Sequence, residues 1–283
     1  MTTIQDRERG DVSRVLSEIP PFPAVAIKTL QVISNEHGQL RELSELISAD
    51  PAFSVQILRV ANSALYGGRV EITGILQAIL ILGLECIKGV VTTIAVKAYL
   101  GDSIEVPGLR DCWRHSLASA VIAEELARMS LIEPDVAYTA GLIHDIGRLG
   151  MVAAYPKEYT AFLTSVETEP GDILQREREL FGIDHCQAGR QLVIRWNLPK
   201  MFIAVTSQHH DAKVAGEAAV LWTVRHSCMI ADALGFDAVH GLAPRSYEEV
   251  LGTLSEHDRR RFPQDPSGLT NYIADKINLI ECT

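Results

Sequence analysis

The stretch Thr139-Ala-Gly-Leu-Ile-His-Asp-Ile-Gly-Arg-Leu-Gly-Met-Val-Ala153 places an imidazole and a carboxylate, His144 and Asp145, side by side within a run of small and apolar residues of helical character. Burying either polar group without a partner would cost several kcal/mol. Two arrangements supply partners: a metal ion bound by both side chains, or a polar core in which each side chain is hydrogen-bonded. Residues elsewhere in the chain must distinguish the two.

The composition is that of a folded protein without a nucleic-acid surface. Of 283 residues, 47% are hydrophobic and 22% are charged, so the chain can form a sizeable core and lies near the boundary between one domain and two. The formal net charge of −10 argues against binding to nucleic acid. The basic cluster Arg259-Arg260-Arg261 lies among acidic residues and is interpreted as a solvated helix end. We therefore expect no nucleic-acid partner.

Cysteine usage and hydropathy predict a cytoplasmic protein that does not contact a membrane. The five cysteines are odd in number and never have C-x-x-C spacing, which is typical of reduced thiols. The segment Met1–Gly10 lacks the apolar region of a secretion signal. The most apolar run, Ile75–Val96, is interrupted by Gln77, Glu85 and Lys88, which favours a buried core helix over a membrane span.

Apolar residues recur with helical spacing along most of the chain, and no segment alternates long enough to predict a strand. The fold class is therefore expected to be all-α. Asp50-Pro51 provides a helix start, and the segment Gly101–Gly108 is the best candidate for a linker between an N-terminal helical lobe and a second helical unit. Helices are expected at Ala24–Ser34, Leu40–Ser48, Ala52–Ala64, from Ile75, Leu84–Leu100, Leu109–Ser130, Pro134–Ala153, Tyr155–Ser165, Asp172–Phe181, His185–Trp196, Pro199–His210, Glu217–Leu234, and near Tyr247 and Leu269.

Several further polar residues could join His144 and Asp145. A single histidine more often packs or caps a helix than binds a metal. A set with one such element on each of several helices is, however, how helical bundles build metal sites from facing side chains. The candidate ligands are His115, His144, Asp145, His185, His209, His210 and Asp232.

The order of these residues resembles that of a known superfamily. His115, then His144-Asp145, then Asp232 is similar to the HD superfamily of metal-dependent phosphohydrolases, and His144-Asp145-Ile146-Gly147 is the HDIG form of its signature. Over about residues 14–235 the chain further resembles the HDOD domain, the HD-related output domain of bacterial signalling proteins. The segments that carry this second resemblance are Ile19–Ala24, Ala49–Pro51, Ile57–Gly67, Ala78-Ile79 with Leu82-Gly83, and Trp196–Pro199 followed by His209-His210.

The resemblance implies an HDOD domain at 14–235, with an N-terminal lobe at about 14–100 and an HD-like core at about 109–235. Residues 236–283 are expected to form a C-terminal helical extension packed on the core. HDOD domains are usually regulatory, and many have lost the metal ligands, whereas this chain keeps a full set. By similarity to HD-GYP phosphodiesterases, Asp145 would bridge two metals. The first would be held by His115, His144, Asp145 and Asp232, the second by Asp145, His185, His209 and His210.

Two departures weaken the similarity to HD-GYP enzymes. Those proteins have His-Asp-x-Gly-Lys and a later Gly-Tyr-Pro segment, whereas here Arg148 replaces the lysine and 211–216 has no such segment. Hydrolysis of cyclic dinucleotides is therefore not favoured. Arg148 is a candidate for binding substrate phosphate through its guanidinium, with a surface position as the alternative. Because successive helical residues diverge by about 100°, His209 and His210 can reach one metal only if their helix ends there.

Three functions remain open. The preferred one is a signal-transduction or regulatory HDOD protein that keeps a binuclear metal site and acts through a signalling protein partner. The first alternative is a metal-dependent phosphohydrolase or phosphodiesterase acting on a phosphate-containing small molecule, and the second is a di-iron oxidase or oxygenase. One or two divalent transition-metal ions are expected. Mixed imidazole and carboxylate ligands favour iron or manganese, with zinc or nickel as alternatives. The sequence assigns no catalytic residue.

Overall fold

The computed structural model describes residues 27–28, 40–63, 71–100, 107–130, 132–168, 171–211, 218–239 and 245–281. Within these residues the regular structure is entirely α-helical, which confirms the expected all-α fold. The predicted helix Ala24–Ser34 lies outside the described residues except for 27–28, and the predicted linker lies outside them except for 107–108.

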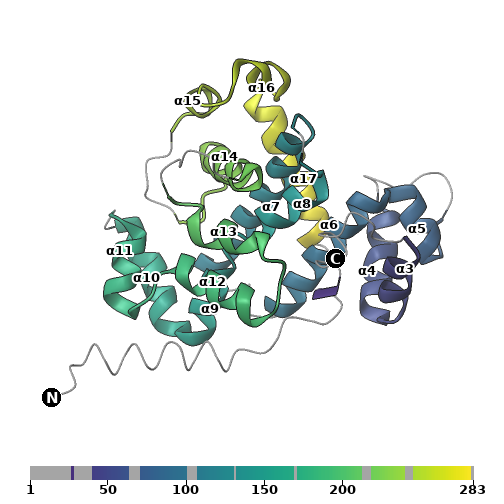
Figure 1. Ribbon diagram of the computed structural model, residues 1–283, viewed down its shortest axis with the longest axis horizontal. Helices are drawn as coiled ribbons and strands as arrows, with labels where there is room; N and C mark the ends of the chain where they lie inside the picture. Colours follow the sequence, from purple (N-terminus) through teal and green to yellow (C-terminus); the bar gives the residue numbers. More distant parts are fainter. Residues whose placement is uncertain are drawn as a thin grey trace.

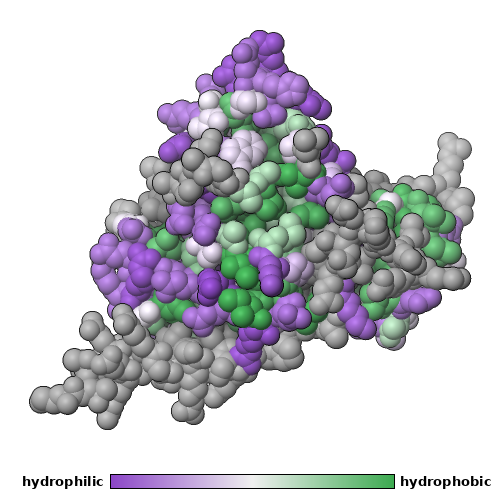
Figure 2. All heavy atoms as spheres, viewed as in Figure 1, coloured by the Kyte–Doolittle hydropathy of each residue, from purple (hydrophilic) through white to green (hydrophobic). Residues whose placement is uncertain are grey.

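The first three helices form an N-terminal lobe at one end of the molecule (Figure 1). Asp50 begins the second of them as expected, because its Oδ1 accepts a hydrogen bond from the Phe53 amide at 3.2 Å. The third helix exposes Leu76, Leu80 and Ile81, and Figure 2 shows apolar side chains gathered there. These helices are α3 (Leu40–Ser48), α4 (Pro51–Ala61) and α5 (Ile75–Leu82).

Helix α6 (Leu84–Leu100) joins the lobe to the core by packing on α4 and α5 and on α8 (Pro134–Ile143). Lys88 Nζ lies 2.7 Å from Asp135 Oδ2, and the hydroxyls of Thr93 and Tyr138 lie 2.9 Å apart. A buried ion pair fixes how two helices meet, since either charge alone would be left without solvation. The lobe and the core therefore share a specific interface.

The core is built around α7 (Pro107–Ala127), against which α8 and α14 (Ala219–Ala233) pack. A second set of contacts joins α9 (Ile146–Ala154), α12 (His185–Arg195) and α13 (Met201–Gln208). The remaining core helices are α10 (Pro156–Thr168) and α11 (Ile173–Phe181).

The C-terminal helices are α15 (Tyr247–Leu251), α16 (Glu256–Arg261) and α17 (Pro266–Glu281). Helix α17 lies against α7, with Ile273 and Ile277 fully buried and Lys276 Nζ 3.5 Å from Glu124 Oε2. Figure 2 shows hydrophilic side chains gathered over α15 and α16, and the three arginines at the end of α16 are exposed, as expected.

The predicted continuous helix Pro134–Ala153 is wrong, because the chain leaves the helix at His144 and Asp145. Helix α8 ends at Ile143 and α9 begins at Ile146, and Asp145 has φ −97° and ψ 17°. Adjacent side chains on a regular helix point about 100° apart. The break instead lets the imidazole and the carboxylate face the same interior space.

Two glycines bring the flanking helices into backbone contact. A Cβ on Gly141 would lie 2.8 Å from the Ala120 Cα on α7, and a Cβ on Gly147 would lie 1.8 Å from the His185 carbonyl oxygen on α12. Only a residue without a side chain allows such an approach. The contacts set the distances between the candidate ligands on α7, on α12 and at the α8–α9 break.

In the described part of the chain no single helix is long and apolar enough to cross a membrane. Helix α5 and the Cys86–Lys97 part of α6 are together long and apolar enough for a membrane span, but the two segments meet at an angle of 116°.

Candidate metal centre

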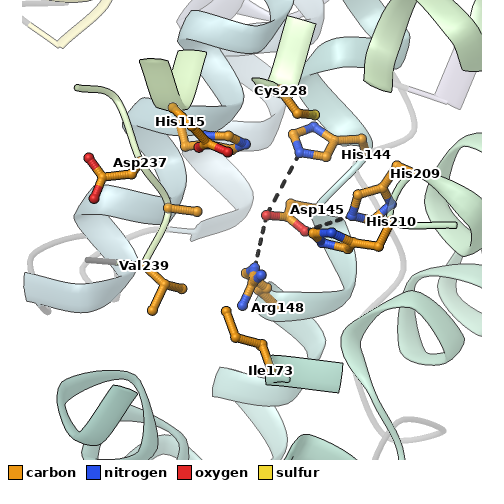
Figure 3. A pocket seen from close by; sticks show the side chains of 12 residues that line it. His115, His144, Asp145, Arg148, Ile173, His209, His210, Cys228, Asp237 and Val239 are labelled. Atoms are coloured by element: carbon orange, nitrogen blue, oxygen red, sulfur yellow. Dashed lines mark hydrogen bonds and ion pairs between the residues drawn. The ribbon is translucent and has the colours of Figure 1, made fainter. Parts of the chain in front are cut away.

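The structure brings all seven predicted ligands to one region of the core. His115 comes from α7, the His144-Asp145 pair from the α8–α9 break, and Asp232 from α14, while the other histidines come from the start of α12 and the end of α13. All of them except His185 line a cavity of about 190 Å³ (Figure 3). The cavity is lined by His115, His144, Asp145, Arg148, Ile173, His209, His210, Cys228, Asp232, Asp237, Ala238 and Val239.

Asp145 lies at the centre of the cluster. Its Oδ1 is 3.4 Å from His185 Nε2 and 3.3 Å from His209 Nε2. All three atoms are buried, and none makes a hydrogen bond. Two ligand atoms placed about 2.0–2.1 Å from one tetrahedral ion would lie roughly 3.3–3.4 Å apart. The two distances to Asp145 Oδ1 therefore match those between ligands of one ion, and a bound ion would supply the partner that each atom lacks.

The ring orientations leave the ligand nitrogens free. His144 Nδ1 is 2.6 Å from the Gly141 carbonyl oxygen, and His209 Nδ1 is 3.1 Å from that of Val205. Each Nδ1 therefore carries the proton and donates it, so Nε2 keeps its lone pair. Burial lowers the pKa of His144 to about 3 and also lowers the pKa of His209. Both imidazoles are neutral near pH 7, which is the form that binds metals.

His115 differs from these rings because it has an acidic partner. Its Nδ1 donates to the Phe236 carbonyl oxygen at 2.8 Å and lies 3.3 Å from Asp232 Oδ1. Burial lowers the pKa of His115, but the contacts with Asp232 and Cys228 raise it more, so the net pKa is above its usual value. The His115 and His144 rings meet edge to face with centroids 5.2 Å apart.

The helix that carries His209 and His210 ends just before them, as joint binding of one metal by both side chains requires. Helix α13 ends at Gln208, and the two residues form a turn with ring centroids 4.3 Å apart. The His210 ring also lies 5.0 Å from that of His185. Burial and the neighbouring histidines hold the pKa of His210 well below its usual value.

Arg148 is buried rather than on the surface, with 2% of its area exposed. Its Nε donates to Asp145 Oδ2 at 2.8 Å, and its Nη1 lies 3.3 Å from the Tyr159 hydroxyl and 3.5 Å from Glu177 Oε1. The guanidinium thus neutralises internal carboxylates. It also lines the cavity, so binding of substrate phosphate by Arg148 stays a prediction.

Glu177 on α11 was missed by the sequence analysis. It is fully buried, and its Oε2 accepts hydrogen bonds from His185 Nδ1 at 2.7 Å and from the His185 amide at 2.8 Å. Burial raises its pKa, but His185 and Arg148 outweigh this and hold the pKa at about 2. A signal was present in the sequence, because Ile173, Glu177 and Phe181 share one helical face. A charged residue on an apolar stripe is a candidate for a buried role.

Two cysteines near the ligands were also missed. Cys228 Sγ lies within 4.8 Å of a ring nitrogen of His115 and of His144. Cys186 Sγ likewise lies within 4.8 Å of a ring nitrogen of His185, of His209 and of His210. Cys228 precedes Asp232 by one helical turn, a spacing that could have drawn attention to it.

We predict that Glu177→Gln weakens metal binding by roughly 10- to 100-fold, the usual effect of losing an outer-shell partner of a ligating histidine. The amide is isosteric with the carboxylate but lacks the charge that holds the His185 ring. Metal affinity is measured by competition with a chromophoric chelator. Glu179→Gln, on the exposed side of the same helix, is the control and should bind as the wild type does. Equal affinity in both variants would contradict a ligand role for His185.

Comparison with known families identifies the chain. A family model of the HDOD domain matches residues 19–212. The chain belongs to the HDOD domain family. An uncharacterised protein of Treponema pallidum (strain Nichols) is 25% identical to this HDOD chain over 256 residues, which are 88% of the chain. The chain spans about half the length of that curated relative, 49% of it.

Solved structures share the HDOD fold. An HDOD domain protein of unknown function from Geobacter sulfurreducens is 21% identical, with a TM-score of 0.72 and coverage of 97% of both chains. A protein from Marinobacter aquaeolei VT8, provisionally described as a signal transduction protein, is 20% identical with a TM-score of 0.76. The match covers 99% of this chain and 67% of that one. One from Shewanella amazonensis SB2B, provisionally described as a phosphohydrolase, is 23% identical with a TM-score of 0.68 and coverage of 95% of both. At these identities the likeness establishes the fold alone.

Proposed function

We propose that this HDOD protein is a regulatory component of bacterial signal transduction that binds a divalent transition metal at the centre of its core and acts through a protein partner. The observation that carries the metal is the meeting of Asp145 Oδ1, His185 Nε2 and His209 Nε2, three buried atoms without hydrogen bonds. In a polar core without metal these buried atoms would keep only their 3.3–3.4 Å contacts with one another and would make no hydrogen bond, each at a cost of about 1–3 kcal/mol.

The electrostatics of the cavity support regulation over catalysis. Among the residues that line it, Arg148 is the single arginine or lysine, and that guanidinium is already paired with Asp145 and Glu177. Asp232 and Asp237 add negative charge to the wall. Such a cavity attracts cations and repels a phosphate dianion unless a metal reverses the local charge.

Phosphohydrolase activity is the second candidate. It is favoured by the cavity beside the ligands and by the provisional description of two structural neighbours from Shewanella amazonensis as phosphohydrolases. A bound metal would supply a nucleophilic hydroxide at neutral pH by lowering the pKa of its water. Asp145 and the histidines would hold the metal. Arg148 would keep Asp145 ionised, because its charge holds the pKa of that buried carboxyl well below the usual range.

The test combines element analysis with an activity panel. Protein purified without chelator is analysed for metals, then assayed with phosphomonoesters, phosphodiesters and cyclic dinucleotides, before and after metal reconstitution. The proposal expects bound metal and no turnover above that of His185→Ala. Metal-dependent turnover lost in that variant would replace the regulatory proposal with the enzymatic one. A wild type that is folded but metal-free after growth in metal-supplemented medium would show that neither the regulatory nor the enzymatic proposal can include a bound metal.

A further inference from the structure

A second group of ligand atoms lies on the other side of His144 from His209. We define the thiol group as His115, His144 and Cys228, whose donor atoms all lie within 4.8 Å of one another. All three residues line the cavity, and Figure 3 shows the Cys228 side chain next to the His144 ring. The two histidines are 4% and 1% exposed. This grouping is distinct from the three atoms that meet at Asp145 Oδ1.

The hydrogen bonds of the two rings leave the same nitrogen of each available for coordination. His115 Nδ1 is bonded to the Phe236 carbonyl oxygen and His144 Nδ1 to that of Gly141, at 2.8 and 2.6 Å. Since each Nδ1 is used as a donor, Nε2 is the nitrogen of each ring that remains for coordination, and His115 Nε2 has only a long contact with the Ser119 hydroxyl, at 3.5 Å. Two imidazoles fixed in this way need only one more donor to form a three-ligand site.

Asp232 and Cys228 are both candidates for that donor, and the structure gives them different positions. Asp232 Oδ1 lies 3.3 Å from His115 Nδ1, the nitrogen that does not coordinate. Its side chain is 42% exposed. This is the arrangement of an outer carboxylate that orients a histidine. Cys228, one turn earlier on α14, has its sulfur within the ligand group itself.

We propose that Cys228 ligates a thiophilic divalent cation of the zinc type together with His115 and His144, and that Asp232 orients His115 from outside the site. This proposal rests on the proposed function, since it names ligands of the same metal centre. Cation binding releases to solvent both the Cys228 thiol proton and the proton that a charged His115 carries at Nε2, so that each ligand atom offers a lone pair. Thiolate ligation selects zinc or cobalt over manganese, magnesium and calcium.

The test is titration of the metal-free full-length protein with Co²⁺, followed by absorption spectroscopy. A thiolate ligand produces a sulfur-to-cobalt charge-transfer band in the near ultraviolet, which imidazole and carboxylate ligands do not. The wild type should show this band, and Cys228→Ser should lose it while its cobalt affinity falls at least 10-fold, the lower limit for loss of an outer-shell partner. Cys86→Ser and Cys186→Ser are controls that should keep the band. Asp232→Asn should keep it with weaker binding.

The outcomes separate this proposal from the proposed function. Bound cobalt without a charge-transfer band in the wild type would overturn the role of Cys228 and leave the metal centre standing. A band lost in Cys186→Ser but kept in Cys228→Ser would place the thiolate near His209. That result would also overturn the role of Cys228 and leave the metal centre standing. Absence of any bound cobalt would overturn both the role of Cys228 and the metal centre itself. If Cys228→Ser fails to fold, the wild type and Cys186→Ser still decide: a band in both supports Cys228 as the ligand, and its absence from the wild type overturns that role.

Discussion

Asparagine in place of Asp145 is expected to lower the free energy of unfolding by about 3 kcal/mol in chelator, the lower end of the cost of breaking a buried ion pair. Arg148 would keep only its longer contacts, with the Tyr159 hydroxyl at 3.3 Å and with Glu177 at 3.5 Å. With metal at 100 times the dissociation constant, the wild type gains a further stabilisation of about 2.7 kcal/mol that the variant cannot gain. The difference between the two proteins should therefore widen to roughly 6 kcal/mol.

Urea unfolding with and without metal measures this difference. Asp135→Asn is the matched control, because it also breaks a buried ion pair, with Lys88, at the interface of α6 and α8. Relative to the wild type, Asp135→Asn should lose the same free energy of unfolding with metal as without it. It should also be stabilised by metal as much as the wild type is. If the gap between wild type and Asp145→Asn is equal with and without metal, Asp145 belongs to a polar core and the metal centre is wrong.

The second large effect is expected for Gly147→Ala. Alanine normally stabilises a helix by about 1 kcal/mol relative to glycine. Here the new Cβ would lie 1.8 Å from the His185 carbonyl oxygen and 2.6 Å from the Gly189 amide nitrogen, both of which are backbone atoms. Backbone cannot rotate aside as a side chain can, so we expect a loss of at least about 3 kcal/mol, the upper end of typical overpacking costs.

Separation of α9 from α12 should also move Asp145 from His185, so metal content should fall together with stability in Gly147→Ala. Gly171→Ala is the control, because its Cβ would meet only Arg176 Cδ at 3.6 Å, an ordinary contact. An exposed change of this kind is expected to stay within about 0.5 kcal/mol of the wild type. A Gly147→Ala variant as stable as the wild type would show that the close approach of the two helices is not required.

The sequence predicts the helical fold well, because helical periodicity is a local property. Its failure at Pro134–Ala153 has a physical cause. The apolar residues on both sides of His144 and Asp145 recur with helical spacing, and the break depends on distant partners. Asp145 meets His185 and His209, and Gly147 meets the α12 backbone, only once α9 is packed. No local pattern contains that information.

The candidate site could be predicted as a set of residues but not as an arrangement. His115, His144 and Asp145 stand out by type and order, and the structure brings them together as expected. The roles of their neighbours depend on hydrogen bonds between helices. Glu177 lies in a charged run that is typical of a solvated face, and it is buried because α11 turns that side toward His185. Likewise, Asp232 and Cys228 share one face of α14, so spacing alone cannot tell which of them lies within the group of candidate ligand atoms.

The distribution of the ligands over α7, α12, α13 and α14 also has a consequence for biosynthesis. No short segment of the chain contains a usable part of the site, since His115 meets Cys228 and Asp232 only when α14 has docked on α7. During translation the last of these residues leaves the ribosome well after the first. Metal loading is therefore expected to follow folding of the core rather than to nucleate it. The cell would then set occupancy through the metal available to the finished protein, not through the metal present while the chain is made.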